Sequence, residues 1–291
     1  MNIFRALLVA AVLLIGWSVV IRQLPEDLET AQTLWGGNLI YAQDYLYEDV
    51  LPEDVAIVGS SLSENLLLRE VAGRRVHRLG LAGQGVFDGL HLVAAAPRRP
   101  GTVFIEMNVV LTGENARFSA AVHDPAMNTI RYHLPVLRQR NQPVGVIKGW
   151  LTAQSGKDET SPGDLQDRPI NNMSLKIKQR DYASSVASDT LLMVLGELRR
   201  RVETLRAEGV RIVFFETPVD PSLCRAPKAL AIRKGFEETF PPGEYAYIRQ
   251  PPCADYQTTD GHHLGKRSLA RYSGWLGEQM EELLKESEFN Q

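Results

Sequence analysis

The sequence predicts an α/β protein in which a central parallel sheet is covered by helices on both faces. Short apolar runs rich in β-branched residues alternate along the chain with longer stretches of helical periodicity. The apolar runs are nearly continuous, as expected for strands that are buried on both faces. A flavodoxin-like three-layer α/β/α sandwich with a parallel central sheet fits this pattern, preceded by a membrane helix at the N-terminus.

Turn-forming residues separate the expected elements; for example, Pro100 and Gly101 precede one strand and Gly209 precedes the next. In chain order we expect strands at 55–58, 76–81, 102–107, 210–216 and 245–248, and helices at 62–70, 87–96, 186–208 and 265–286. Sites in such sheets lie at the carboxyl ends of the strands. The residues expected there are Ser61, Gly83, Asn108, Thr217 and the loop at Asp260.

Residues 1–24 are expected to form an export segment. The apolar run at 6–21 has no polar face, and it is preceded by Arg5 and followed by Arg22 and acidic residues. Its length approaches the roughly 20 residues that span a bilayer, which favours an uncleaved anchor with the domain on the periplasmic or extracellular side. Gly16-Trp-Ser18 loosely fits a small-x-small cleavage site, so a secreted, cleaved form is the alternative.

Two stretches depart from the strand and helix alternation. Residues 25–54 are acidic and amphipathic and are expected to form a helical lead-in to a domain at 55–291. That domain carries an insertion at about 111–183, which holds five prolines and a polar part at 156–167. An insertion of this length is more often a lid or substrate platform than a linker. Five of its side chains are candidates for ligand contact, with ordinary surface or packing roles as the alternative: His123, Arg131, His133, Trp150 and Tyr182.

A candidate nucleophile follows the first strand. The apolar run at 55–58 leads into Gly59, Ser60 and Ser61 and then into the expected helix. A serine in such a turn has a free backbone N–H and lies at the positive end of the helix dipole, where an oxyanion is stabilised. The alternative is that Ser60 or Ser61 only caps the helix, because serine is a favoured cap residue.

A second motif, Asp260-Gly-His-His263, lies about two hundred residues downstream. An aspartate three residues before a histidine can hold the imidazole through its Nδ1–H and leave Nε2 to take a proton from a serine hydroxyl. His262 is only two residues from Asp260, so the spacing selects His263 as the base and leaves His262 as a ligand-facing or simply exposed neighbour. Together, the two motifs favour a catalytic role for Ser61 over capping.

From about residue 55 to the C-terminal helix, these motifs resemble the sequence blocks of the SGNH (GDSL-like) hydrolase superfamily. The nucleophile block is similar to Gly59-Ser60-Ser61-Leu62, with Ser61 at the nucleophile position and Ser60 where many members carry Asp. The last block, Asp-x-x-His, is matched by Asp260 and His263.

Two further blocks of that superfamily concern the oxyanion hole. The block whose glycine N–H lines the hole resembles Gly80-Leu-Ala-Gly-Gln84 and points to Gly83. In another block an asparagine follows a buried strand, and Asn108 occupies that place here, although the usual preceding pair of glycines is missing. The resemblance therefore implies an oxyanion hole formed by the N–H groups of Ser61 and Gly83, with Asn108.

The resemblance also implies a reaction, a serine acyl-ester hydrolase or acyl transferase. Membrane-anchored relatives in bacteria often remove or transfer small acyl groups, commonly acetyl, on cell-envelope or exported polysaccharides. An acylated glycan or small acyl ester is therefore the implied partner, with an inner-membrane protein as a further candidate. An acyl-enzyme can be discharged to water or to a sugar hydroxyl, so both reactions stay open.

The alternative from a different functional class is a non-catalytic envelope assembly or binding protein that retains this fold. Ser60 in place of Asp and the incomplete block before Asn108 favour this alternative. The presence of Ser61, Asp260 and His263 opposes it.

Charge and motif content exclude other functional classes. The chain has 32 Lys and Arg against 35 Asp and Glu, a net charge of −3, and no basic stripe, so a nucleic-acid partner is not expected. No phosphate-binding glycine loop and no metal-ligand spacing occurs, so no cofactor or metal is expected.

The two cysteines, Cys224 and Cys253, bracket a proline-rich loop after the 210–216 strand. In an exported domain they are well placed to form a disulfide that braces the loop presenting Asp260 and His263. Two unrelated buried thiols are the alternative.

Overall fold

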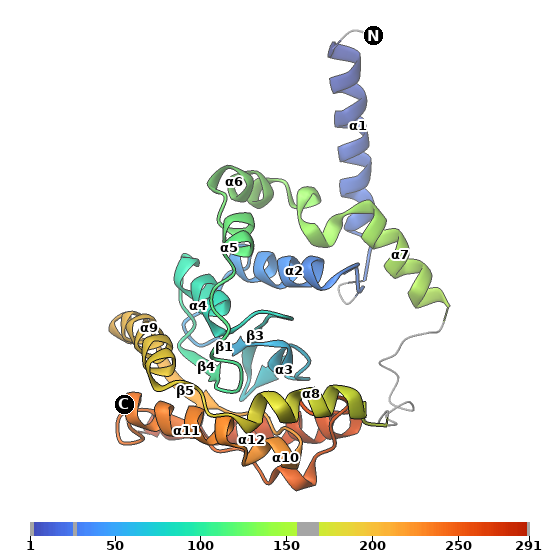
Figure 1. Cartoon of the computed structure of the whole chain (residues 1–291). Helices are drawn as coiled ribbons and strands as arrows, with labels where there is room; N and C mark the ends of the chain where they lie inside the picture. Colours follow the sequence, from blue (N-terminus) through green and yellow to red (C-terminus); the bar gives the residue numbers. More distant parts are fainter. Residues whose placement is uncertain (1–2, 26–27, 156–168, 290–291) are drawn as a thin grey trace. The chain divides into compact units, whose positions relative to one another are not determined.

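The computed structural model describes residues 3–25, 28–155 and 169–289 (Figure 1). The chain divides into two compact units, one comprising Met1–Tyr47 and Ala120–Asp164 and the other Glu48–Ser119 and Leu165–Gln291. The expected insertion at 111–183 is thus shared: its middle belongs to the first unit and its two ends to the second. Its polar part at 156–167 lies outside the described residues.

The second unit contains a mostly parallel, curled sheet of six strands in the order β2-β3-β1-β4-β5-β6. The strands are β1 (Val55–Gly59), β2 (Glu70–Val71), β3 (Arg74–Gly80), β4 (Thr102–Glu106), β5 (Arg211–Phe215) and β6 (Ala246–Ile248). Every neighbouring pair is parallel except β2 and β3. All five predicted strands are present, and each end lies within two residues of its expected position. The two-residue strand β2 is additional, because it is too short to leave a periodic signal.

Helices pack on both faces of this sheet. The described helices of this unit are α3 (Ser61–Glu64), α4 (Val86–Ala95), α8 (Asn172–Ala183), α9 (Ser188–Ala207), α10 (Pro221–Cys224), α11 (Pro227–Thr239) and α12 (Lys266–Phe289), with a 3-10 turn, η4 (Cys253–Asp255). On one face, Tyr272 and Leu276 of α12 share a buried cluster with Ile57 of β1 and other strand side chains. On the other, the Phe214 ring packs 5.3 Å from the Phe236 ring of α11.

Two expectations for the helices of this unit are wrong. The helix expected at 62–70 ends at Glu64, since Leu66 and Leu68 are buried while Leu67 is 60% exposed, an alternation that suits extended chain. The proline-rich loop between the cysteines contains the helix α11. Pro227 is its first residue, where the missing N–H costs nothing and the fixed φ favours a helix start.

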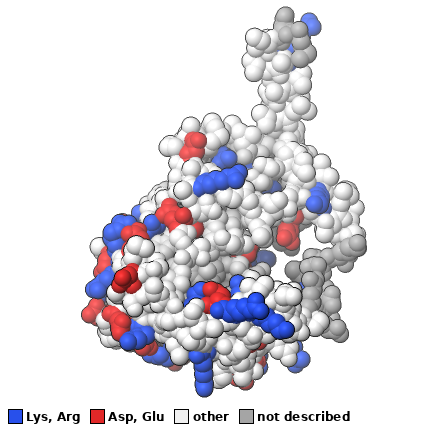
Figure 2. Space-filling view, viewed as in Figure 1, with Lys and Arg blue, Asp and Glu red and all other residues white. Residues whose placement is uncertain are grey.

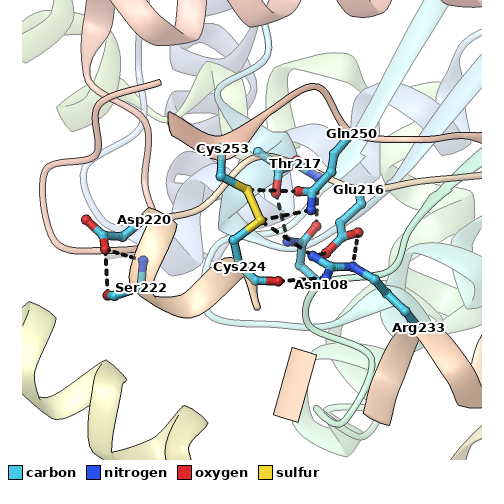
Figure 3. Close-up of a disulfide and its surroundings, with 9 residues drawn as sticks. All are labelled: Asn108, Glu216, Thr217, Asp220, Ser222, Cys224, Arg233, Gln250 and Cys253. Atoms are coloured by element: carbon cyan, nitrogen blue, oxygen red, sulfur yellow. Dashed lines mark hydrogen bonds and ion pairs between the residues drawn. A yellow bond between two sulfur atoms is a disulfide. The ribbon is translucent and has the colours of Figure 1, made fainter. Parts of the chain in front are cut away.

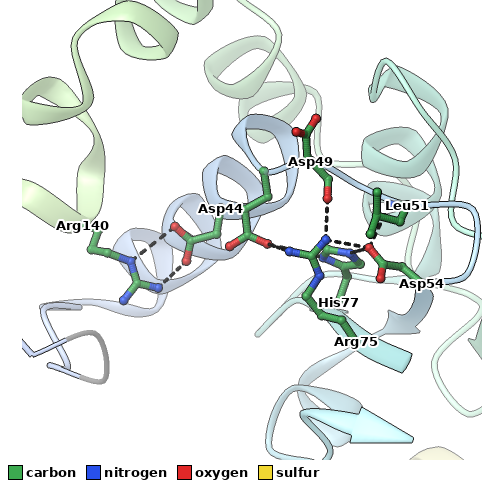
Figure 4. A network of polar contacts seen from close by, with 8 residues as sticks. Asp44, Asp49, Leu51, Asp54, Arg75, His77 and Arg140 are labelled. Atoms are coloured by element: carbon green, nitrogen blue, oxygen red, sulfur yellow. Dashed lines mark hydrogen bonds and ion pairs between the residues drawn. The ribbon is translucent and has the colours of Figure 1, made fainter. Parts of the chain in front are cut away.

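The regular secondary structure among the described residues of the first unit is helical. Its helices are α1 (Ile3–Ile21), α2 (Leu34–Tyr47), α6 (Pro125–His133), α7 (Pro143–Gln154) and the 3-10 turns η1 (Pro135–Leu137) and η2 (Gln139–Asn141). Helix α5 (Ala116–Val122) crosses the boundary between the units. Arg140 of η2 forms an ion pair with Asp44 of α2 (Figure 4), and Gln139 donates its backbone N–H to Gln43 at 2.7 Å. These contacts join α2 to η2.

Helix α1 is the one helix among the described residues that is long and apolar enough to cross a membrane. None of its side chains is buried against the rest of the protein. An N-terminal apolar helix of this kind is either a membrane anchor or a signal sequence.

A polar cluster fixes the N-terminal end of the sheet in the second unit (Figure 4). The buried Asp54 carboxylate accepts hydrogen bonds from Leu51 N–H at 2.9 Å and from Arg75 at 2.8 Å, and it lies 2.9 Å from His77 Nε2. Burial alone would raise the pKa of Asp54, but these hydrogen bonds together lower it. The cluster secures the start of β1, and the opposite end of β1 leads into the candidate site.

Candidate active site

The turn after β1 is built over a buried carboxylate. Glu106, the last residue of β4, is fully buried and accepts hydrogen bonds from the Ser60 N–H at 2.9 Å and the Ser60 hydroxyl at 2.8 Å. A Cβ at position 59 would overlap the Glu106 carboxylate and the Ser63 hydroxyl, so only glycine lets these groups approach the turn. Burial raises the pKa of Glu106, although hydrogen bonds from Ser60 and Ser63 oppose that change.

The three serines of this turn have different roles. Ser60 is the helix cap, because its Oγ accepts the Leu62 N–H at 3.2 Å. Ser63 is fully buried and donates its hydroxyl to the Ser60 carbonyl at 3.1 Å. Ser61 is partly exposed, and its Oγ lies 2.8 Å from Nε2 of His263. Capping and the histidine contact therefore fall on different residues.

The histidine lies in a closed loop between β6 and α12. Thr258 and Leu264 form an antiparallel bridge, and Thr259 donates its N–H to the His263 carbonyl at 2.8 Å. Gly261 has φ +98°, a conformation that favours glycine. The loop thus returns on itself within a few residues, which brings Asp260 beside His263.

Asp260 holds His263 through both of its carboxylate oxygens. Oδ2 lies 2.8 Å from the His263 Nδ1, while Oδ1 accepts the backbone N–H groups of His262 at 2.9 Å and His263 at 2.8 Å. Burial alone would raise the pKa of Asp260, but the hydrogen bonds from the ring and backbone of His263 hold it well below its usual range. The carboxylate is therefore ionised at neutral pH and orients the imidazole, leaving Nε2 directed at Ser61.

Gly83 lies in the loop that follows β3, next to the serine turn. Gly59 of β1 pairs with Gly80 of β3, and the Leu81 N–H donates to the Gly59 carbonyl at 3.2 Å. The two loops therefore leave neighbouring strands at the same level. Gly83 has φ +69°, a conformation that favours glycine, and a side chain added at this position would meet open space. Its backbone is therefore not covered by a side chain of its own or by the neighbouring described atoms.

The side chain of Asn108 is engaged in a backbone clamp (Figure 3). Its Nδ2 donates to the Thr217 carbonyl at 2.9 Å, and its Oδ1 accepts the Thr217 N–H at 2.8 Å. Both residues follow parallel strands, β4 and β5, so the amide joins the two strand ends. This contact uses one of the two Nδ2 hydrogens, and the geometry gives Asn108 a structural role at the edge of the site.

His262 is buried and points away from solvent. Its ring packs edge to face against Tyr182 of α8, with centroids 5.1 Å apart. The expectation of an exposed His262 side chain is therefore wrong, because Tyr182 of α8 covers the loop here. Burial and, secondarily, the charge of Lys178 lower the pKa of His262 to about 4. Tyr182, one of the candidate ligand contacts, has a packing role in this structure.

We expect His262 to make stability depend on pH. In the unfolded chain it binds a proton near pH 6.5, but in the folded protein only near pH 4. Between these pH values the unfolded state binds more protons at His262 than the folded state does. The stability that the neutral His262 contributes is therefore fully present above pH 6.5 and is lost as the pH falls towards 4. The difference corresponds to roughly 3 kcal/mol. Urea titrations from pH 7 to 4.5 should show a smaller loss for His262→Phe than for wild type, and parallel losses would contradict this origin.

The disulfide predicted between Cys224 and Cys253 is present in the structure (Figure 3). It joins the end of α10 to η4. Nearby, the Asp220 N–H at the start of α10 donates to the Gly261 carbonyl at 2.9 Å, inside the loop that carries Asp260 and His263. The bridge therefore holds a segment that itself supports the histidine loop.

Removal of this disulfide should destabilise the second unit. Because the sequence separation is 29 residues, the chain-entropy model gives a loss of about 3 to 4 kcal/mol for Cys224→Ser with Cys253→Ser. Denaturant titrations of the variant against wild type measure it. Intact mass after thiol alkylation without reductant is the accompanying control, and two alkylated cysteines in wild-type protein from an oxidising compartment would contradict the pairing.

Glu106 was missed by sequence reasoning, although it had a signal. A carboxylate within the apolar run at 103–107 is unexpected in a buried strand and calls for a polar partner. The role of α8 behind His262 had no such signal. Among the described residues, no group of three or more His, Cys, Asp or Glu side chains is placed to hold a metal ion.

Comparisons with known proteins add no relative to this picture. The chain matched no protein-family model, no curated protein and no solved structure.

Proposed function

We propose that this protein is an SGNH-like serine acyl-ester hydrolase or acyl transferase. The observation that carries the proposal is the hydrogen-bonded series Ser61–His263–Asp260, with 2.8 Å between Ser61 Oγ and His263 Nε2 and 2.8 Å between His263 Nδ1 and Asp260 Oδ2. Three residues from two distant parts of the sequence meet with the atom pairing that nucleophilic catalysis requires.

In the proposed reaction, Ser61 Oγ attacks the ester carbonyl carbon while His263 Nε2 takes the hydroxyl proton. The backbone N–H groups of Ser61 and Gly83 are the proposed donors to the oxyanion. His263 then gives its proton to the departing alcohol oxygen, which leaves an acyl-serine. Water or a sugar hydroxyl, deprotonated by His263, attacks this ester, and His263 returns the proton to Ser61 Oγ as the bond to the acyl carbon breaks, which releases the acid or the transferred acyl ester and restores the serine. Asp260 stays ionised throughout and stabilises the charged imidazole.

Strand order supports the finer assignment of the fold. If the short antiparallel β2 is set aside, the parallel strands run in the order second, first, third, fourth, fifth, which is the flavodoxin-like order. In that arrangement ligands bind where the order reverses, between β1 and β4. The serine turn follows β1, and Asn108 follows β4 by two residues. We therefore assign the domain to the flavodoxin-like three-layer sandwiches.

For location, we propose an uncleaved anchor formed by α1, with the catalytic unit on the periplasmic or extracellular side. The apolar exposed helix supports the anchor, and the Cys224–Cys253 disulfide supports an oxidising compartment. An acylated cell-envelope or exported polysaccharide is the proposed substrate, following the superfamily resemblance, and an inner-membrane protein is the proposed partner in transfer.

A second candidate is a non-catalytic envelope protein that uses the same fold for binding. The observation that favours it is the Asn108 clamp, because an amide committed to Thr217 has less freedom to serve an oxyanion.

Covalent labelling by a fluorophosphonate distinguishes the two candidates without knowledge of the substrate, because the probe needs an activated serine. Wild-type protein and the cap variant Ser60→Ala should both be labelled, whereas Ser61→Ala should not. A folded wild-type protein that resists the probe would favour the binding protein.

A further inference from the structure

Helix α7 of the first unit has an apolar face that the described residues leave uncovered. Val144, Ile147 and Leu151 recur at helical spacing and are 71%, 54% and 54% exposed. Trp150 is 48% exposed, and Lys148, also exposed, supplies the one charge of the helix. Surface helices normally turn polar residues to water, so this face requires an apolar environment.

The opposite face of α7 is packed, which fixes the rotation of the helix about its axis. A side chain at Gly145 would overlap the Thr30 carbonyl, and one at Gly149 would overlap the Glu29 carbonyl. Val146, between them, is buried. The two glycines therefore let α7 pack directly against the backbone of the segment that follows α1. Ile147 and Leu151 consequently point away from that segment.

A hydrogen bond ties η2, which directly precedes α7, to α1 itself. Trp17, in the last part of α1, donates its indole N–H to the Asn141 carbonyl at 2.7 Å, two residues before α7 begins at Pro143. Figure 1 shows the start of α7 beside the C-terminal end of α1. In the view of Figure 2 the surface of α1 is white below its N-terminal end, and the sequence has no charged residue between Arg5 and Arg22. The apolar face of α7 thus begins where the apolar surface of α1 ends.

We propose that α7 lies in the membrane interface, with Val144, Ile147 and Leu151 inserted at the boundary between headgroups and acyl chains. Lipid is the occupant that fits, because the face adjoins a lipid-facing helix and α7 has no acidic side chain. Trp150 and Lys148 combine an apolar body with a polar end, as residues at membrane surfaces do. This inference rests on the proposed anchor and extends it to a second membrane contact.

The test uses the full chain reconstituted in phosphatidylcholine vesicles, with an environment-sensitive NBD fluorophore on one introduced cysteine. The native cysteines are paired, so the new thiol is the sole labelling site. We expect the label at Ile147→Cys to emit with a blue shift and to be quenched by spin-labelled lipid. The matched control, Thr152→Cys, lies on the glycine side of α7 and should emit as in water and be quenched by iodide.

Other outcomes overturn the inference in distinguishable ways. A water-like emission at position 147 leaves the face in solvent, and a blue-shifted emission that lipid quenchers do not reach means that a protein or a second copy covers it. A third label, at Val12→Cys in α1, tests the anchor separately, so that a failure of the anchor can be distinguished from these two outcomes at position 147. If Val12 reports lipid while Ile147 reports water, only the interfacial helix is wrong. If α1 is cleaved or lies in water, the anchor fails and this inference fails with it.

Discussion

Replacing Ser61 with alanine should lower turnover of a small acetyl ester by about 10⁴-fold or more while leaving the fold intact. The expected loss is this large because Ser61 Oγ is the atom paired with His263 Nε2, and no other serine of the turn is. Stability should change little, since the side chain is partly exposed and is not the helix cap. Initial rates, with thermal unfolding followed by circular dichroism, measure both quantities.

Ser60→Ala is the matched control, one residue away in the same turn. It removes the cap and the hydroxyl hydrogen bond that Glu106 accepts, so it should lower stability by about 1 to 2 kcal/mol. Turnover should be largely retained, because the Ser61–His263 contact does not pass through the Ser60 hydroxyl. If Ser60→Ala abolished turnover and Ser61→Ala did not, the nucleophile would be misassigned.

The parts of this fold that were predictable from sequence depend on local pattern. Five apolar runs predicted five strands, because strands buried on both faces need no polar alternation. The serine turn was predictable for the same reason: Gly59 and two serines directly follow such a run. The pairing of Asp260 with His263 was also accessible, since three residues of spacing let a carboxylate and an imidazole meet across a turn.

The parts that were not predictable depend on distant segments. Glu106 supports Ser60 only because β4 pairs beside β1, and that pairing is a property of the sheet. His262 is buried because α8, about eighty residues earlier, covers the loop through Tyr182. The 111–183 stretch could not be divided between two units from composition alone. Pro227 lies in the stretch expected to be a proline-rich loop, where as a first helical residue it starts α11.

The two adjacent histidines should differ sharply in their effect on turnover, and this contrast tests the proposed base. His263→Ala should reduce turnover by several orders of magnitude, because it removes the group that takes the Ser61 proton. Asp260→Asn should cost somewhat less, since Oδ1 still accepts the two backbone N–H groups while the ring loses its ionised partner.

His262→Phe is the control for this contrast, since phenylalanine keeps a ring against Tyr182 and keeps the backbone N–H that Asp260 accepts. It should leave kcat nearly unchanged, because the His262 ring is buried and its pKa of about 4 keeps it neutral at the pH of the assay. Single-turnover rates on the same acetyl ester, with each variant's folding checked, give the comparison. Equal losses at both histidines would mean that the loop acts as a unit and that the assignment of the base by spacing is wrong. Full activity of His263→Ala would mean that His263 is not the base and that turnover does not depend on the Ser61–His263–Asp260 series.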